Sequence, residues 1–499
     1  MAITAGGSLN SVALPQKQAA TSNYLDLAST ANQGWAQQYL PDLMEKEAEV
    51  FGQRTISGFL SQVGAEEAMQ ADEVVWSEQS RLHLAYTGQI TDGDAGTIAG
   101  GQITIGNDID GQAAGSSHGI RKNDTVLIAS SEGTVKALVT LVTAGSAVIE
   151  VAPYGVVDLN DVFQDNQGAN SVTVLVYGSE YKKGDNYDGD STRGANEPVF
   201  KSFSNKPIIL KDYYEVTGSD TSRIGWVEVA AEDGRSGYLW YLKAESDTRA
   251  RFNDYLEMSM LESVKGGAAA GYTGGVADLT DSHLYAGGGE VTGTQGLFNA
   301  IEERGNITSG VTGVNAATDL AEFDAILAEF DNQGAIEENM LFVNRATSLA
   351  MDDMLASMNS HGAGGTSYGV FENDEDMALN LGFSGFRRGS YDFYKSDFRY
   401  LNDKATRGSI NSAYSAGAIR GVIIPAGTST VYDQTLGKNL KRPFLHVRYR
   451  ASSTDNRKMK TWTTGSVGAA TSALDAMQIH MLSERCLITQ GANNFMLMK

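Results

Sequence analysis

Short β-strand patterns occupy residues 75–230 of this chain, and a long helical pattern at 237–264 comes directly after them. Within the first region, apolar runs such as Thr125–Ala129 and Val135–Val142 are separated by turns rich in Gly and Ser. Strands of this length and spacing are typical of a small barrel or sandwich. In a chain of 499 residues, the change from strands to helix predicts several domains of mixed α and β structure.

Charge and composition exclude several classes of function. The chain has 38 basic and 61 acidic side chains, a net charge of −23, which argues against a dedicated binder of nucleic acid or of anionic membranes. No apolar run is long enough to cross a membrane, and residues 1–34 lack the basic and apolar regions of a signal peptide. The single cysteine, Cys486, excludes an intrachain disulfide and fits a reducing compartment. The sequence therefore predicts a soluble protein made in a cytoplasm.

The expected parts of the chain follow from changes in composition and periodicity. Residues 1–40 are small, polar and nearly uncharged, which fits either a frayed tail or an arm that becomes ordered against a neighbouring copy. Trp35 and Tyr39 would be the apolar anchors of such an arm. The other expected parts are 41–74 with an N-terminal helix, 75–230 with a separable β domain at about 119–178, 231–285 with the helix 237–264, 286–440 with alternating helices and strands, and 441–499 with C-terminal strands and a helix.

Local signals give finer predictions. Asp319 and Glu322 form a capping-box pattern ahead of a helix that Gly334 would end. The hydrophobic periodicity further predicts a strand at Met340–Val343, a helix at Ala346–Met358, a helix at Thr471–His480 and a loop at 91–118.

Motifs that carry chemistry are missing from the sequence. The six histidines are scattered and no two are spaced i, i+4, so no metal site is predicted. The Asp-rich segments Asp108–Gly111 and Asp185–Asp190 do not fit the twelve-residue calcium loop. Neither a nucleophile elbow nor a phosphate-binding loop occurs, and Cys486 in its apolar run is interpreted as a structural thiol. We therefore expect no cofactor and no catalytic activity.

Basic residues concentrate at Lys438 to Lys460, where eight cations stand against one acid. A strand at Phe444–Arg450 would place His446, Arg448 and Arg450 on one face, where they repel each other unless anions lie opposite. DNA phosphates or the carboxylates of the same or a neighbouring subunit could supply those anions. The overall acidity of the chain favours carboxylates. The adjacent arginines Arg387 and Arg388 invite the same interpretation, so these residues are candidate contacts between subunits.

The order of these parts resembles the major capsid proteins of tailed bacteriophages with the Hong Kong 97-type fold. The resemblance depends on the polar arm at 1–40, the β excursion at 75–230, the long helix that begins at Ser236-Gly237-Tyr238, the α/β part from 286 and the C-terminal run SERCLITQGANNFMLMK. It covers nearly the whole chain and is a likeness of layout, because that family has no short diagnostic motif.

The resemblance implies an α+β fold in which the excursion is an extended E-loop, 231–285 with helix 237–264 belongs to the peripheral domain and 286–440 is the axial domain. It implies a non-enzymatic subunit of an icosahedral virion shell, assembled in the bacterial cytoplasm as hexamers and pentamers around double-stranded DNA. No sequence-specific DNA binding, membrane or cofactor is implied. Because the chain has no long charged N-terminal helix, a separate scaffolding protein is expected, along with a portal and decoration proteins. The alternatives are an encapsulin-type nanocompartment shell protein and an α/β enzyme based on 286–425.

Overall fold

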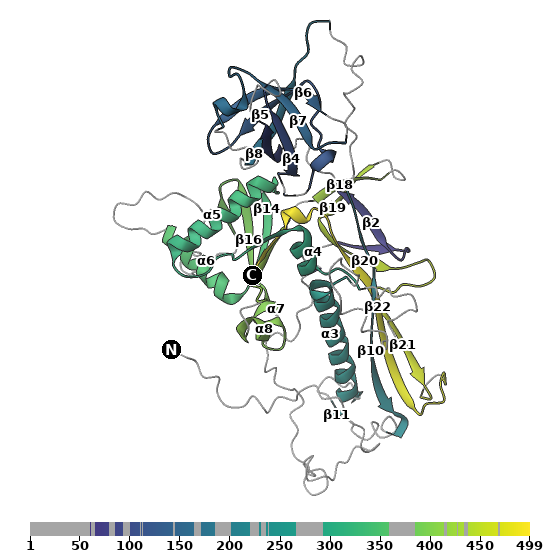
Figure 1. Ribbon diagram of the computed structural model, residues 1–499. Coiled ribbons are helices and arrows are strands. Elements are labelled where there is room, and N and C mark those ends of the chain that lie inside the picture. The colour runs from purple at the N-terminus through teal and green to yellow at the C-terminus, as the bar shows by residue number, and fades with distance from the viewer. Residues whose placement is uncertain are drawn as a thin grey trace. The chain divides into compact units, whose positions relative to one another are not determined.

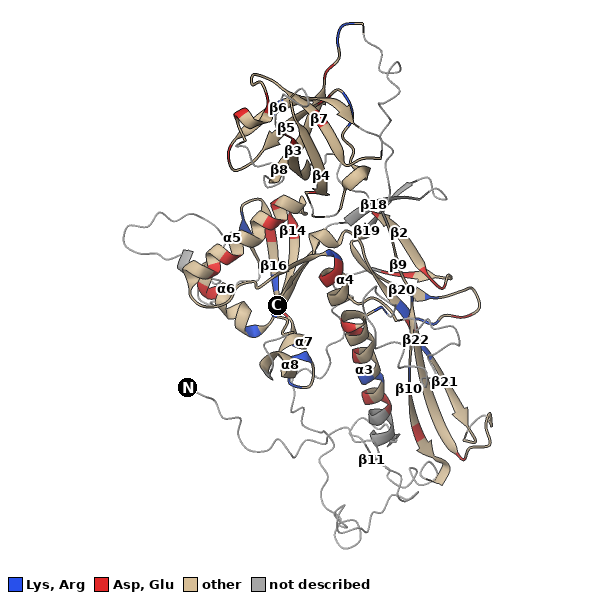
Figure 2. Ribbon diagram, viewed as in Figure 1, with Lys and Arg blue, Asp and Glu red and all other residues tan. Residues whose placement is uncertain are grey.

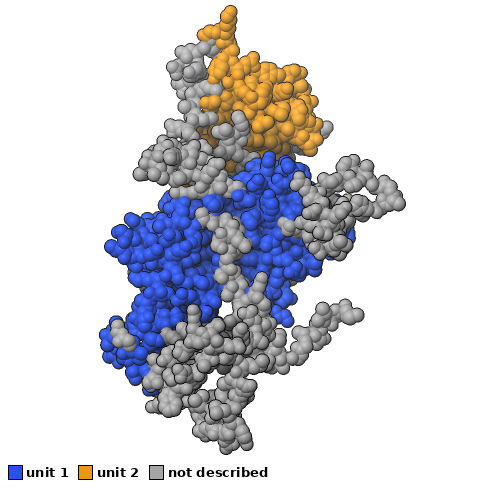
Figure 3. Space-filling model, turned by 180° about the vertical axis from the view of Figure 1, so that it is seen from behind, with its two compact units in different colours: residues 1–76, 204–499 blue, residues 77–203 orange. Residues whose placement is uncertain are grey.

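The computed structural model in Figure 1 describes residues 60, 65–78, 85–92, 100–109, 111, 113–142, 145–163, 171–184, 201–219, 229–230, 236–237, 239–265, 293–358, 385–413, 417–426, 428–433, 438–467 and 470–499. The chain forms two compact units, one from residues 1–76 and 204–499 and the other from residues 77–203 (Figure 3). Each unit has its own hydrophobic core.

The unit at 77–203 is built around a closed barrel. Its strands are ordered β3-β4-β7-β6-β5-β8, with every neighbouring pair antiparallel. Alternate side chains of each strand point inward, and Val126, Ile128 and Val174 are completely buried. The strands are β3 (Ala85–Asp92), β4 (Gln102–Asp108), β5 (Asp124–Ala129), β6 (Thr134–Val142), β7 (Val148–Pro153) and β8 (Ser171–Ser179), with short 3-10 turns η4 (Gly115–Ser117) and η5 (Leu159–Asp161).

This barrel is larger than the β domain expected at about 119–178, because β3 and β4 are needed to close it. The prediction of a loop over 91–118 is wrong at β4. Ile103 and Ile105 of that strand point into the barrel core, while Thr104 between them points outward. The alternation of apolar and polar residues along β4 is short, and Gly- and Asp-rich residues flank it on both sides, so the sequence did not indicate a strand there.

The other unit contains a five-stranded sheet centred on the long strand β22. β10 runs antiparallel to β22 on one side, while β20 and β21 pair with successive parts of its other side. β1 adds to β20 in parallel and forms the edge. The strands are β1 (Ala65–Met69), β10 (Ile208–Thr217), β20 (Leu445–Arg450), β21 (Lys460–Gly465) and β22 (Ala476–Thr489).

One sequence prediction is wrong in this sheet, and one of its strands was not predicted. Thr471–His480 is not helical: β22 starts at Ala476, because hydrogen bonding to both β10 and β21 outweighs the helix-like apolar spacing. The N-terminal helix expected within 41–74 falls outside the described residues except at Leu60, which is helical, and the unpredicted strand β1 follows in the same segment. Its residues Ala-Glu-Glu-Ala-Met have no β propensity, and tertiary pairing with β20 decides their conformation.

Helix α3 (Leu239–Glu262) agrees with the predicted helix at 237–264. It packs on one face of the β10–β22–β21 sheet, where Phe252 and Leu256 contact Met481 and Leu210. Arg251 of α3 also reaches Asp212 of β10 at 3.5 Å. One face of this sheet is therefore covered by helix α3 (Figure 1).

A second sheet in the same unit has six strands in the order β13-β23-β17-β14-β16-β15. Helices α5 and α6 pack against it through Phe323, Phe330 and Met354. The elements of this region are α4 (Leu297–Arg304), β13 (Asn306–Thr308), α5 (Ala316–Gln333), β14 (Glu338–Val343), α6 (Arg345–Met358), β15 (Gly385–Arg388), β16 (Tyr391–Asp397), β17 (Gly421–Pro425) and β23 (Met496–Met498).

Helix α5 has a different N-cap from the one predicted. Asn315 is the capping residue and accepts a hydrogen bond from the Thr318 amide at 3.0 Å. Glu322 instead accepts hydrogen bonds from Thr312. The predicted end is confirmed, because Gly334 adopts the left-handed conformation there with φ of 64°.

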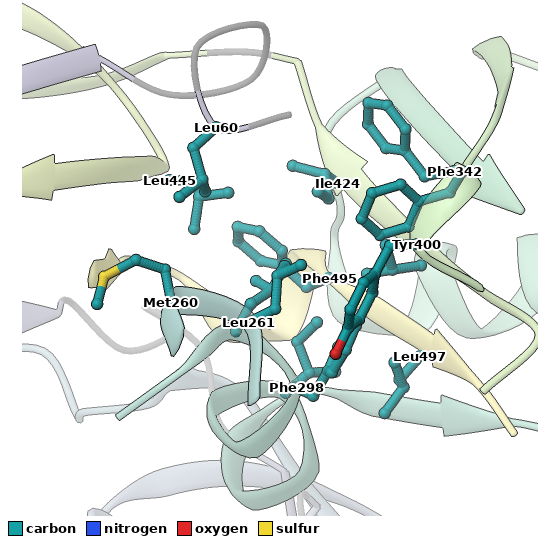
Figure 4. Packing of buried hydrophobic residues seen from close by; sticks show 14 of the residues in the cluster. Leu60, Met260, Leu261, Phe298, Phe342, Tyr400, Ile424, Leu445, Phe495 and Leu497 are labelled. Atoms are coloured by element: carbon teal, nitrogen blue, oxygen red, sulfur yellow. The ribbon is translucent and has the colours of Figure 1, made fainter. Parts of the chain in front are cut away.

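One apolar cluster joins the two sheets of this unit (Figure 4). Met260 and Leu261 of α3, Phe298 of α4, Leu445 of β20 and Leu497 of β23 all belong to it.

The remaining elements are β2 (Val74–Glu78) paired with β9 (Lys201–Asn205), β11 (Val229–Ala230) with β12 (Ser236–Gly237), β18 (Thr428–Asp433) with β19 (Lys438–Pro443), α7 (Arg399–Asn402), α8 (Arg407–Ala413) and the 3-10 turn η9 (Ala492–Asn494).

Candidate interaction surfaces

The basic face of β20 meets carboxylates of the same chain. Arg448 lies 3.2 Å from Glu67 of β1, and Arg450 lies 2.6 Å from Glu484 of β22 and contacts Asp72. Three carboxylates that contact the basic segment come from residues 65–72, since Glu66 also pairs with Lys458. The prediction that this face would meet acidic residues is correct. Strand β1 supplies Glu67, the segment after it supplies Asp72, and β22 supplies Glu484.

Glu484 is the buried centre of this network. Its carboxylate accepts a hydrogen bond from Arg450 on one oxygen and lies 2.8 Å from Arg457 on the other. The side chain of Glu484 is 5% exposed, so water solvates its negative charge very little. The two arginines compensate for that lost solvation. Strand β1 was not predicted from the sequence, so its adjacent acids Glu66 and Glu67 were not recognised as partners of the basic segment.

The other candidate arginines lie in a different sheet. Arg388 on the edge strand β15 donates a bidentate pair of hydrogen bonds to Asp324 of α5, from Nε to Oδ1 at 2.5 Å and from Nη2 to Oδ2 at 2.6 Å. This hydrogen bonding raises the pKa of Arg388. Arg387 lies 3.6 Å from Asp392 on β16. The structure therefore separates this pair from Arg448 and Arg450, and Trp35 and Tyr39 lie outside the described residues. The role of all these residues between subunits remains a prediction.

An aromatic row crosses the β10–β22–β21 sheet on the face opposite α3. Tyr213 stacks on His480 with ring centroids 6.0 Å apart, and His480 stacks on Trp462 at 5.1 Å. Strand register places the three residues directly opposite one another. Tyr213 is 57% exposed. Ile209, four residues earlier on the same face of β10, is also exposed. Rings exposed in this way provide contact area for a partner.

The described residues offer little for catalysis. A surface hollow of about 400 Å³ is lined by Thr312, Asn344, Asp353 and Arg420 among others, and its lining has no histidine, cysteine or lysine. Burial raises the pKa of the Cys486 thiol to about 12, which keeps it protonated and unreactive. Over the described part of the chain, no group of acids, histidines or cysteines is placed to hold a metal ion. No helix of the described part is long and apolar enough to span a membrane.

Comparison with known proteins gives structural likeness without sequence likeness. No family model matches the sequence, and no curated protein is significantly similar to it. A chain of Microbacterium phage Oxtober96 is 8% identical with a TM-score of 0.38, over 95% of this chain and 99% of that one. A chain of Mycobacterium phage Ogopogo is 8% identical with a TM-score of 0.39, over 95% and 98%. A chain of the bacteriophage PhiM1 mature capsid is 8% identical with a TM-score of 0.32, over 64% and 78%. At these values the likeness alone does not decide what this chain does.

Proposed function

We propose that this chain is the major capsid protein of a tailed bacteriophage and that its copies form an icosahedral shell around packaged double-stranded DNA. The observation that carries the proposal is the layout of the unit formed by residues 1–76 and 204–499. A long helix, α3, lies along an extended antiparallel sheet, and a separate six-stranded sheet carries its own helices. This layout is consistent with the pairing of peripheral and axial domains that the sequence resemblance implies.

The surfaces of the chain support a role in self-association. The sheet covered by α3 leaves its other face open with the Tyr213, His480 and Trp462 row. The acidic balance of the chain, −23, suits a wall that encloses DNA without binding its phosphates tightly. In this proposal the subunits form hexamers and pentamers, and a separate scaffolding protein, a portal and decoration proteins take part. Assembly takes place in the host cytoplasm.

Electron microscopy and analytical ultracentrifugation of the purified chain test this function. The measurements are made with the chain alone and with a co-expressed scaffolding protein. Closed shells of uniform diameter are the expected result in at least one of these conditions. Monomers or small soluble oligomers at every concentration in both conditions would contradict the proposal.

A further inference from the structure

Strand β10 has one edge that no other strand pairs with. Over the described part of the chain β10 pairs with β22 alone, and Figure 2 shows it at the margin of the sheet that also contains β21. The strand is ten residues long, contains no proline and keeps an unbroken register with β22 from Ile208 to Thr217. Proteins usually protect an edge of this length with a bulge, a proline or a shortened strand, because its free amides and carbonyls can pair with another chain.

The hydrogen bonds of β10 show which residues present backbone groups along this edge. The Gly218 amide continues the register with β22 and donates to the Asp475 carbonyl at 3.0 Å. The Tyr213 amide instead donates to the side chain of Asp212 at 2.9 Å, so it points away from β22. Because backbone groups alternate in direction along a strand, the odd-numbered residues of β10 present their amides and carbonyls outward.

The side chains along the edge are self-complementary about Tyr213. Only outward-pointing backbone groups can meet, so a second copy of β10 must pair odd-numbered residues with odd-numbered residues. If the copies are antiparallel with Tyr213 opposite its counterpart, Lys211 of each copy lies opposite Glu215 of the other. The adjacent registers pair Tyr213 with Lys211 or with Glu215, and those beyond pair Lys211 or Glu215 with itself. Opposite charges stabilise antiparallel pairs and like charges destabilise them, so charge selects the register centred on Tyr213.

The side chains that would meet in this register are accessible. Lys211 is exposed, and over the described residues its ammonium group has no ion pair. Glu215 is also exposed and accepts a hydrogen bond from Gln478 at 2.7 Å, a neutral partner that leaves the negative charge uncompensated. Tyr213 is more than half exposed at the end of the aromatic row. Pairing about Tyr213 would join the aromatic rows of two copies into one.

We propose that β10 pairs antiparallel with β10 of a second copy of the chain about a two-fold axis at Tyr213, an inference that rests on the proposed self-assembly. On pairing, the Tyr213 amide exchanges the Asp212 carboxylate for the Tyr213 carbonyl of the other copy, and two sheets become one. Such a contact uses the same surface on both copies, so it closes between two chains and does not form a ring. The β10 pair therefore joins a subunit of one hexamer or pentamer to a subunit of the next.

Cysteine crosslinking in the assembled full-length protein tests the register. Tyr213→Cys places two thiols opposite each other across the axis, with a Cα separation of about 5.5 Å that a disulfide can span. Oxidation, or a short bifunctional thiol reagent, should link these chains as dimers, while the native Cys486 is buried in every variant. Lys211→Cys is the matched control and should not link to itself, but it should link to Glu215→Cys chains mixed with it before assembly. Self-linking of Lys211→Cys, or unlinked Tyr213→Cys in assembled shells, would overturn the proposal.

Charge reversal gives a second readout. Lys211→Glu and Glu215→Lys each place like charges opposite one another, so either variant alone should need an about tenfold higher concentration for shell formation. An equal mixture of the two variant proteins restores opposite charges across the contact and should assemble close to the wild-type concentration. A defect within one chain is not rescued by mixing. Lys404→Glu, the same change at an exposed site outside β10, should assemble as the wild type does. Unchanged thermal unfolding of the unassembled variants confirms that they are folded.

The outcomes separate this inference from the proposed function. Wild-type chains that form no shells under any condition refute the function before any variant is made. Wild-type shells together with charge-reversal variants that assemble at the wild-type concentration overturn the β10 contact alone. Variants that fail to assemble and are not rescued by mixing would assign the defect to one chain or to a different partner of this edge, such as a scaffolding protein, and would also overturn it.

Discussion

At the residue scale, Glu484 shows how a buried charge depends on its partners. The carboxylate is almost inaccessible and is held between Arg450 and Arg457. Removing one member of a buried pair is far more costly than the pair is worth, because the remaining charges lose their solvation without compensation. The half-buried pair Arg448–Glu67 on the same sheet is expected to matter less, because water reaches it and screens it more than it does Glu484.

Glu484→Ala should therefore lower the free energy of unfolding by about 3–5 kcal/mol. Glu67→Ala, the matched control on the same basic face, should cost less than about 1 kcal/mol. Urea denaturation of both variants measures the difference. Equal losses for the two substitutions would show that burial of Glu484 is not what makes its network important.

His118 gives the barrel a dependence on pH. Burial lowers the pKa of this histidine, and the backbone carbonyls of Ser146 and Ile120 offset only part of the effect. The unfolded chain binds a proton at the ordinary pKa of about 6.5, while the folded barrel resists it. The unfolded state therefore binds more protons as pH falls below that value, and the folded state loses stability there.

Thermal unfolding of the barrel transition between pH 7.5 and pH 5 measures this effect. The wild type should lose stability over that interval, by about 1.4 kcal/mol for each unit by which the pKa is lowered. The variant His118→Gln has no titrating group at this position, so its free energy of unfolding should depend less steeply on pH than that of the wild type. Identical slopes for the two proteins would exclude His118 as the source.

At the scale of elements, the β21–β22 hairpin depends on one glycine. Gly465 ends β21 with a φ of 134°, a conformation that residues with a side chain rarely adopt. A Cβ at this position would collide with the Ala476 carbonyl, which begins the partner strand. Gly334 at the end of α5 also has a positive φ, but a Cβ there would meet nothing.

Gly465→Ala should destabilise the sheet by more than about 2 kcal/mol, because strain and collision add. Gly334→Ala should cost about 1 kcal/mol, the conformational strain alone. Differential scanning calorimetry measures the stability of both variants, which carry the same Gly→Ala substitution at different positions. A larger loss for Gly334→Ala would contradict the collision argument.

Elements with a strong local period could be predicted from the sequence, and those formed by tertiary pairing could not. Helix α3, the end of α5 at Gly334 and the strands of the barrel from β5 onward have clear periodicity and turn residues. Strand β1 and the start of β22 do not, since their conformation comes from hydrogen bonds to distant strands. Arg448 and Arg450 were found as a basic face, but Glu67 and Asp72 were missed for this reason.

At the scale of the whole molecule, the two units are joined by a short paired stem. Strand β2 leads into residues 77–203, and β9 leads out and pairs with it. Asn205 at the end of β9 is buried and donates hydrogen bonds to the carbonyls of Leu487 and Gln295, at 2.6 and 3.1 Å. The stem is thus anchored by contacts that do not involve the barrel.

Replacing residues 79–200 with a short Gly/Ser linker should leave the rest of the chain folded. The paired stem already holds the two ends of the excised segment close together, so the entropy of closing a short linker is small. The excised segment also carries a hydrophobic core of its own, formed by residues of the barrel. Circular dichroism should retain the helical signal of α3, α5 and α6, and unfolding should remain cooperative. An insoluble product, or one without that helical signal, would show that the barrel is required for folding of the other unit.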